Sequence, residues 1–156
     1  MRAEPTPFDF SPSAGAPKIP GDVSARATMA LLASADRVRR SLAEPLAAHG
    51  VTLAQYAVLL VLRAAGPEGL PTLEAGRQLI EHAPGITRMM DRLESRGWVT
   101  RRRGNGDRRQ VLCALTVAGQ ELVDRLAEPV ADAMHLGLGR LDSAQQRELL
   151  KLLSVI

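Results

Sequence analysis

Arginine is concentrated in one stretch of the chain, between Gly85 and Thr116. Guanidinium groups crowded in this way attract a polyanion such as DNA, because the local field is far more positive than the formal net charge of +3 suggests. The alternative is a basic face that only contacts solvent, which is the usual role of a run of charges. The stretch holds three acids, Asp91, Glu94 and Asp107, and eight arginines, Arg88, Arg92, Arg96, Arg101, Arg102, Arg103, Arg108 and Arg109.

The spacing of apolar residues places some of these arginines on a helix. Four apolar residues recur at helical spacing and can pack on a core: Ile86, Met89, Met90 and Leu93. Gly97 follows, and it suits a left-handed residue that ends the helix. The opposite face, which could enter a DNA groove, carries Thr87, Arg88, Asp91, Arg92 and Ser95.

A β-hairpin is predicted directly after this helix. The segments 98–100 and 111–115 favour strands, and the turn from Gly104 to Asp107 contains Asn and Gly, which tolerate positive φ. Arg101, Arg102 and Arg103 alternate along the first strand, so they cannot all face DNA, and at least one should pair with the protein body. A basic helix followed by a basic hairpin is typical of a DNA-reading helix followed by a wing.

The hairpin also carries the most specific motif of the sequence. Asp107-Arg108-Arg109 is followed by Ala114-Leu115-Thr116 and then by Ala118-Gly119. This order resembles the wing signature of the MarR (multiple antibiotic resistance regulator) family of winged helix-turn-helix transcription factors. The recognition helix of that family resembles Ile86-Thr87-Arg88, Asp91-Arg92-Leu93-Glu94 and Arg96-Gly97, and its second helix resembles the segment from Leu53 to Leu62 with Tyr56.

The resemblance extends from Val23 to the end of the chain and implies a mainly α fold with a small β-hairpin wing. Residues 22–156 are expected to form one MarR-like domain, with a winged helix-turn-helix at 52–115 and dimerisation helices at 22–49 and 116–156. Those outer helices carry more apolar surface than a small winged domain can cover, and the resemblance implies a two-fold dimer. The alternative is that they pack on their own monomer. Ala75-Gly76 departs from the family pattern, so the helix there should be loosely packed or closely approached by a neighbour.

Residues 1–21 contain five prolines and are expected to form an irregular N-terminal arm, either packed on a partner subunit or without fixed structure. Further along the chain, Thr52 with Gln55 predicts a capping box that opens a helix ending near Ala65. The other predicted helix signals are N-caps at Thr72, Thr116 and Asp142, a first-turn Pro84, a kink or end at Pro45, a kink at Pro129, and a stop at Gly137 and Gly139.

The predicted DNA contacts fall into two groups. The helix residues Gly85, Thr87, Arg88 and Arg92 are placed for the major groove or adjacent phosphates, and the wing residues Arg108 and Arg109 for a narrow minor groove. Asp91 is expected to form an ion pair on the helix surface rather than to contact a base. By resemblance, Asp107 orients the wing. The implied partner is double-stranded DNA, which a homodimeric repressor would bind at an inverted repeat.

Other classes of function lack their characteristic residues. No nucleophile beside a base, carboxylate pair or metal-ligand spacing is recognisable, and His49, His82 and His135 are isolated, so neither an enzyme nor a metal or other cofactor is expected. A single cysteine forms no intramolecular disulfide, and no apolar run approaches the ~20 residues of a membrane span. With no secretory signal pattern either, we expect a cytoplasmic protein without a membrane partner.

Three modes of regulation are compatible with the sequence. The resemblance implies release from DNA by a small aromatic or phenolic anion held between the dimerisation helices and the winged domain, with His49 and Tyr56 as candidate wall residues. A cysteine-based redox-responsive regulator is the second, although Cys113 shares a strand face with Val111 and Leu115 and should be buried. A ligand-independent architectural DNA binder is the third.

Overall fold

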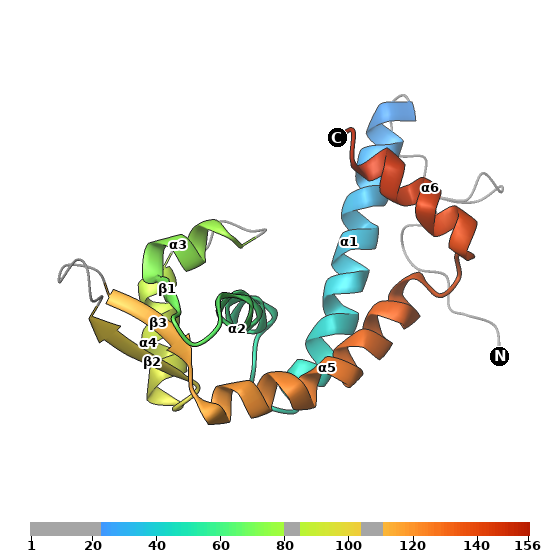
Figure 1. The fold of residues 1–156 in the computed structure, drawn as a ribbon. Helices are drawn as coiled ribbons and strands as arrows, with labels where there is room; N and C mark the ends of the chain where they lie inside the picture. The colour runs from blue at the N-terminus through green and yellow to red at the C-terminus, as the bar shows by residue number, and fades with distance from the viewer. Residues whose placement is uncertain (1–22, 80–84, 104–110) are drawn as a thin grey trace.

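The computed structural model describes residues 23–79, 85–103 and 111–156 of the 156-residue chain. The described part is mainly helical with a small antiparallel sheet, as predicted (Figure 1). The elements follow in the order α1 (Val23–Ala47), α2 (Leu53–Ala65), β1 (Leu70–Pro71), α3 (Thr72–Arg77), α4 (Ile86–Ser95), β2 (Val99–Arg103), β3 (Val111–Leu115), α5 (Val117–Leu138) and α6 (Ser143–Leu153).

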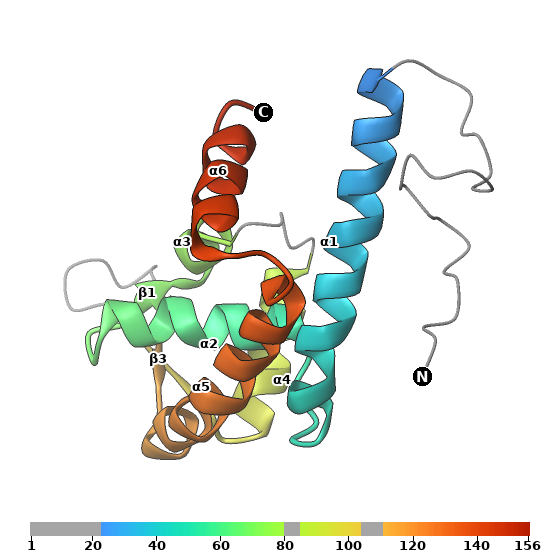
Figure 2. The ribbon, with the colours of Figure 1, turned by 90° about the vertical axis from the view of Figure 1, so that its right-hand side faces the viewer.

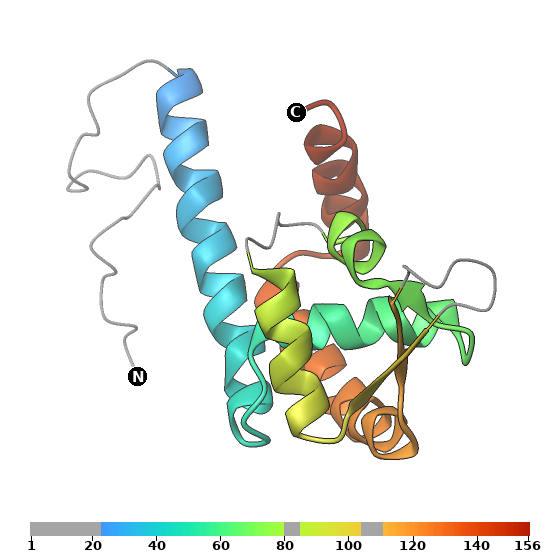
Figure 3. The ribbon, with the colours of Figure 1, turned by 90° about the vertical axis from the view of Figure 1, so that its left-hand side faces the viewer.

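The elements form two connected parts (Figure 1). The first contains α2, α3, α4 and the three-stranded sheet, in which β3 lies between β1 and β2 and pairs antiparallel with both. The second contains α1 and α5, which pack against each other, and α6, which projects from the end of α5. Figures 2 and 3 show α6 standing apart from α1, and most residues of α6 are exposed.

Local sequence signals set most helix starts as predicted. The Thr52 hydroxyl accepts a hydrogen bond from the Gln55 backbone amide at 3.2 Å, and the Gln55 side chain accepts one from the Thr52 amide at 2.9 Å, which completes the capping box of α2. Asp142 and Gln145 form the same arrangement at α6, and Thr116 caps α5.

The prolines do not end their helices. Pro45 and Pro129 lie inside α1 and α5, and α5 also continues through Gly137 to Leu138 before it ends at Gly139. Buried Val130 and Ala133 anchor α5 after its proline, so tertiary packing outweighs the local loss of one backbone hydrogen bond. The predicted stop at Gly137 is therefore wrong, whereas the one at Gly139 is confirmed.

Thr72 is the first residue of α3 rather than its N-cap, because Pro71 occupies the cap position and makes no side-chain cap bond. The Thr72 hydroxyl instead lies 3.2 Å from the Cys113 sulfur on β3. The pairing of β1 explains this contact. Pro71 pairs with Leu112 of β3, so α3 begins directly beside the sheet. The predicted N-cap at Thr72 is thus wrong.

One apolar core joins the two parts. Its largest fully buried residues come from four helices and from the strands β2 and β3, and they include Leu46 of α1, Leu59 of α2, Met90 of α4 and Leu126 of α5. Large apolar side chains nevertheless remain exposed on the outer helices, among them Leu31, Leu32, Met134, Leu136, Leu150, Leu152 and Leu153. The core thus fixes the position of α4 without using the apolar surface of α6.

Candidate nucleic-acid interface

Helix α4 lies at the surface with one face against the core. Ile86, Met90 and Leu93 are buried on that face, as their spacing predicted. Gly85 precedes the helix with φ 95°, and Gly97 follows it with φ 73°, both in the left-handed region that glycine adopts without strain. The helix is therefore fixed in rotation by its core face and bounded at both ends by glycine.

Close packing of α3 on α4 explains the unusual Gly76. A Cβ atom at this position would lie 3.3 Å from Cγ1 of Ile86, which is tighter than ordinary contact. Of the two alternatives expected from the sequence, close approach by a neighbour is thus the one observed. The absent side chain lets the two helices of the helix-turn-helix unit pack closely.

The polar side of α4 presents two exposed arginines. Arg88 and Arg92 are exposed, and neither guanidinium group makes a hydrogen bond or ion pair within the described part of the chain. Thr87 and Gly85 are exposed beside them, at the N-terminal end of the helix. The structure therefore brings together the four predicted helix contacts on one accessible surface.

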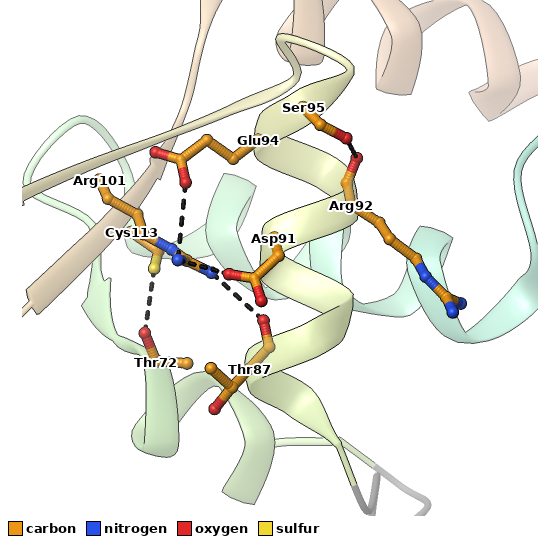
Figure 4. Close-up of polar contacts among 8 residues, drawn as sticks. All are labelled: Thr72, Thr87, Asp91, Arg92, Glu94, Ser95, Arg101 and Cys113. Carbon is orange, nitrogen blue, oxygen red and sulfur yellow. Dashed lines mark hydrogen bonds and ion pairs between the residues drawn. The ribbon is translucent and has the colours of Figure 1, made fainter.

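The acids of α4 are engaged by Arg101 of β2 (Figure 4). Its Nη1 atom lies 2.7 Å from a carboxylate oxygen of Asp91 and 3.5 Å from one of Glu94. Its Nη2 atom donates a hydrogen bond of 3.2 Å to the backbone oxygen of Thr87. We refer to Arg101, Asp91, Glu94 and Thr87 as the Arg101 cluster.

The Arg101 cluster corrects the expected surroundings of Asp91. The ion pair exists, but it joins Asp91 to a neighbouring strand rather than to an arginine of its own helix. Burial lowers the pKa of Arg101, yet the hydrogen bond with Asp91 and the charges of Asp91 and Glu94 outweigh this effect and raise it overall. The Arg101 side chain is 23% exposed and stays charged.

The other two arginines of β2 differ from each other. Arg102 reaches away from α4 to Glu68, with 2.8 Å from Nη2 to a carboxylate oxygen and 2.8 Å to the backbone oxygen of the same residue. Arg103 ends the strand and is exposed, with no partner among the described residues. The expectation that at least one arginine of this strand pairs with the protein body is confirmed by Arg101 and Arg102.

Arg96 connects the end of α4 to the turn after α1. Its Nη1 atom donates a 2.5 Å hydrogen bond to the backbone oxygen of Gly50, and its guanidinium carbon lies 4.9 Å from the centre of the Trp98 ring. A cation over an indole ring is attracted by the negative face of the ring. Arg96, although exposed, therefore links the C-terminal end of α4 to the turn after α1.

The predicted wing contacts Arg108 and Arg109, and the predicted orienting residue Asp107, lie outside the described residues. The strands that lead to them pair in register, with Arg103 opposite Val111 and Arg101 opposite Cys113. The predicted hairpin strands are confirmed. The sheet has a further strand, β1, that the sequence did not predict.

The three residues considered for ligand binding or sensing have different environments. Tyr56 is 5% exposed and belongs to the core, and burial raises the pKa of its hydroxyl, which the charge of Arg63 partly opposes. His49 is exposed in the turn after α1. Cys113 is fully buried, as predicted, beside the Thr72 hydroxyl. Tyr56 and Cys113 are thus both packed in the core, whereas His49 is not.

The described residues contain no group of three or more potential metal ligands. None of the helices in the same ranges is both long and apolar enough to cross a membrane.

The Arg101 cluster and the contact of Arg96 with Gly50 are the parts of the site that sequence reasoning missed. Strand alternation indicated that some arginine would turn inward, but nothing local indicates which acid it meets.

An amphipathic helix with a basic outer face, followed by a β-hairpin packed beside it, defines a winged helix-turn-helix protein.

Comparisons with known proteins agree with this class. A family model described as "Transcriptional regulator SarA/Rot" matches residues 41–126, more than half of the chain. The HTH-type transcriptional regulator TtmR of Methylorubrum extorquens (strain PA1) is 36% identical over 107 residues, which are 69% of this chain and 54% of that regulator. The chain thus spans about half the length of this curated relative.

Two solved structures are similar over most of the chain. The MarR transcription factor from Planctomyces limnophilus is 34% identical with a TM-score of 0.68, and the match covers 87% of this chain and 98% of that one. A mutant of MarR from E. coli, complexed with operator DNA, is 28% identical with a TM-score of 0.75, covering 86% and 97%. The chain belongs to the MarR family of winged helix-turn-helix transcriptional regulators.

Proposed function

We propose that this protein is a sequence-specific DNA-binding transcriptional regulator that reads the major groove with α4. The observation that carries the proposal is the exposed pair Arg88 and Arg92 on a helix held rigidly by its core face. Arg96, Arg101 and Arg102 bind acids or carbonyl oxygens, whereas Arg88 and Arg92 have no partner among the described residues. Their position side by side on α4 points to an external anionic partner.

The proposed contacts follow from position along α4. Arg88 and Arg92 lie one helical turn apart and can contact base edges or the flanking phosphates. Thr87 can contact a phosphate or a thymine methyl group, and Gly85 allows the backbone to approach the DNA closely. Arg108 and Arg109 remain proposed minor-groove contacts, oriented by Asp107.

We further propose that the protein acts as a homodimer. Leu150, Leu152 and Leu153 are 67%, 56% and 42% exposed on α6, and Leu136 is 80% exposed near the end of α5. These large apolar side chains lie on helices outside the winged part. Burying them against the same apolar surface of a second copy of this chain would remove them from water. A two-fold dimer would present two α4 helices to an inverted repeat, about 34 Å apart.

Repression and release by a small aromatic or phenolic anion complete the proposal, and both derive from the family resemblance. The protein would act in the cytoplasm, in contact with the DNA. Complete burial of Cys113 favours a packing role over oxidant sensing, because a sensing cysteine must be reachable by the oxidant. The architectural alternative differs in having no effector that changes its affinity for DNA.

Selection of bound fragments from a random-sequence duplex pool tests the proposal directly. We expect enrichment of an inverted repeat, and sedimentation of protein with the selected duplex should give two chains per site. Recovery of unenriched sequence would contradict specific recognition, and a one-to-one complex would contradict the dimer. Titration of the complex with benzoate and salicylate as probes distinguishes a ligand-responsive regulator from an architectural protein.

A further inference from the structure

We propose that Arg101 is a positioning residue for DNA binding: it holds the carboxylate groups of Asp91 and Glu94 against β2, and so leaves Arg88 and Arg92 free for DNA. This inference rests on the proposed function, since it concerns the same surface. Arg101 would act through the acids of α4 and would not itself contact DNA.

The geometry of α4 places an acid beside the arginines proposed to bind DNA. At about 100° per residue, Asp91 lies close to the face that carries Arg88 and Arg92. Acids of this chain do pair along their own helices: Glu74 binds Arg77 at 3.3 Å, Glu148 binds Lys151 at 3.4 Å, and Asp36 binds Arg40. Asp91 and Arg88 have the three-residue spacing of the first two of these pairs, yet Asp91 binds Arg101 instead.

Figure 4 shows how the competition is resolved. Arg101 meets Thr87, Asp91 and Glu94 along one side of α4, and the Arg92 side chain extends away on another side. Both carboxylates approach the same nitrogen, Nη1, so one guanidinium group engages two negative charges. Without Arg101, two uncompensated carboxylates would border a surface that must approach phosphates, and Asp91 could engage Arg88.

The backbone around Arg101 is well suited to this role. Arg101 pairs with Cys113 at the middle of the five residue pairs that join β2 to β3, and Cys113 is fully buried. Strand pairing fixes the backbone of Arg101, and its planar guanidinium group loses less freedom for each hydrogen bond formed than a lysine ammonium group would. The strand thereby holds the acids of α4 in place before DNA arrives.

The test uses a fluorescently labelled duplex enriched by the unmodified protein from a random-sequence pool. Arg101→Ala should weaken binding to this duplex by about tenfold, a loss within the range of one important charged contact. Arg102→Ala is the matched control, because it removes the same charge from the neighbouring residue but breaks a pair with Glu68, away from α4. We expect its effect to stay below about threefold, as for an exposed ion pair.

The decisive measurement is rescue by a second substitution. Asp91→Ala in the Arg101→Ala background should restore most of the lost affinity, whereas Asp91→Ala alone should change binding little because that charge is already compensated. A double variant as weak as Arg101→Ala would overturn the proposal in favour of a direct contact or a purely structural role. An equal gain from Asp91→Ala in both backgrounds would also overturn it, since charge alone would then explain the result.

Thermal unfolding of each variant separates affinity from folding. If Arg101→Ala is unfolded at the assay temperature, Arg101→Gln replaces it, because glutamine can still donate to the Thr87 carbonyl while the charge is removed. Failure to enrich any duplex with the unmodified protein would contradict the proposed function. Enrichment without rescue would contradict only the role of Arg101.

Discussion

Gly119 offers the sharpest test of how the sheet is joined to α5. It belongs to the motif by which the sequence resembled the MarR family, and the structure gives it a physical reason. A Cβ atom at Gly119 would collide with the backbone oxygen of Trp98 and lie 2.9 Å from the carbonyl carbon. The same Trp98 oxygen accepts a 3.1 Å hydrogen bond from the Thr116 amide. Gly119→Ala must therefore displace the backbone rather than a flexible side chain.

The expected cost of Gly119→Ala combines three terms. Replacing glycine by alanine in a helix favours folding by at most about 1 kcal/mol. Forcing a methyl group into a filled site costs about 1–3 kcal/mol, and disturbing the Trp98 hydrogen bond costs about 1 kcal/mol more. The net expectation is a decrease of about 1–3 kcal/mol in the free energy of unfolding, measured by urea denaturation.

Gly137→Ala is the matched control in the same helix. A Cβ atom there would lie 3.6 Å from the nearest atom, Cγ2 of Val38, which is ordinary van der Waals contact. This variant should be unchanged or more stable by up to about 1 kcal/mol, because only the helix-propensity term remains. Equal stabilities of Gly119→Ala and Gly137→Ala would refute the close approach of α5 to the Trp98 backbone.

Four further outcomes are expected. Binding to the selected duplex should weaken with salt, with a slope between about −5 and −9 on logarithmic axes for six to ten phosphate contacts per dimer; a flat titration would contradict it. Leu150→Glu should convert dimer to monomer in sedimentation without unfolding the chain, since that side chain is 67% exposed. Arg109→Ala should cost about 1–3 kcal/mol of binding and weaken preference for A·T-rich flanks, whereas Arg88→Ala should relax selection within the half-site. Burial raises the pKa of Tyr56, so stability should fall as pH rises above about 10, where the unfolded chain loses this proton first, and Tyr56→Phe should reduce that fall.

The features that the sequence predicted correctly depend on neighbours along the chain. The buried face of α4, with Met90 and Leu93, follows from helical spacing alone. The capping box at Thr52 needs only a partner three residues later, and Gly97 needs only its own conformational freedom. Such signals are complete within one or two helical turns, so no knowledge of the tertiary fold is required.

The features that were missed depend on contacts between distant segments. β1 is two residues long and includes a proline, so nothing in its own sequence indicates a strand until β3 supplies the pairing. The same pairing moves Thr72 from a cap to a contact with Cys113, 41 residues away. The helix α5 likewise continues through Gly137 to Leu138, although a glycine was expected to stop it, and buried Val130 and Ala133 hold this part of the helix against the core.

Counting arginines, for the same reason, indicates a basic region without indicating which charges are available to DNA. Arg96 and Arg102 bind backbone oxygens of other segments, and Arg101 binds the acids of α4, whereas Arg88 and Arg92 have no partner within the described residues. Carboxylates balance the charges of Arg101 and Arg102, and Arg96 is held by the Gly50 oxygen and the Trp98 ring. Arg88 and Arg92 would form ion pairs or hydrogen bonds only when the phosphates or bases of DNA are bound. The positive field thus has two parts, one that assembles the DNA-reading surface and one that acts from it, and the Arg101 substitutions separate them experimentally.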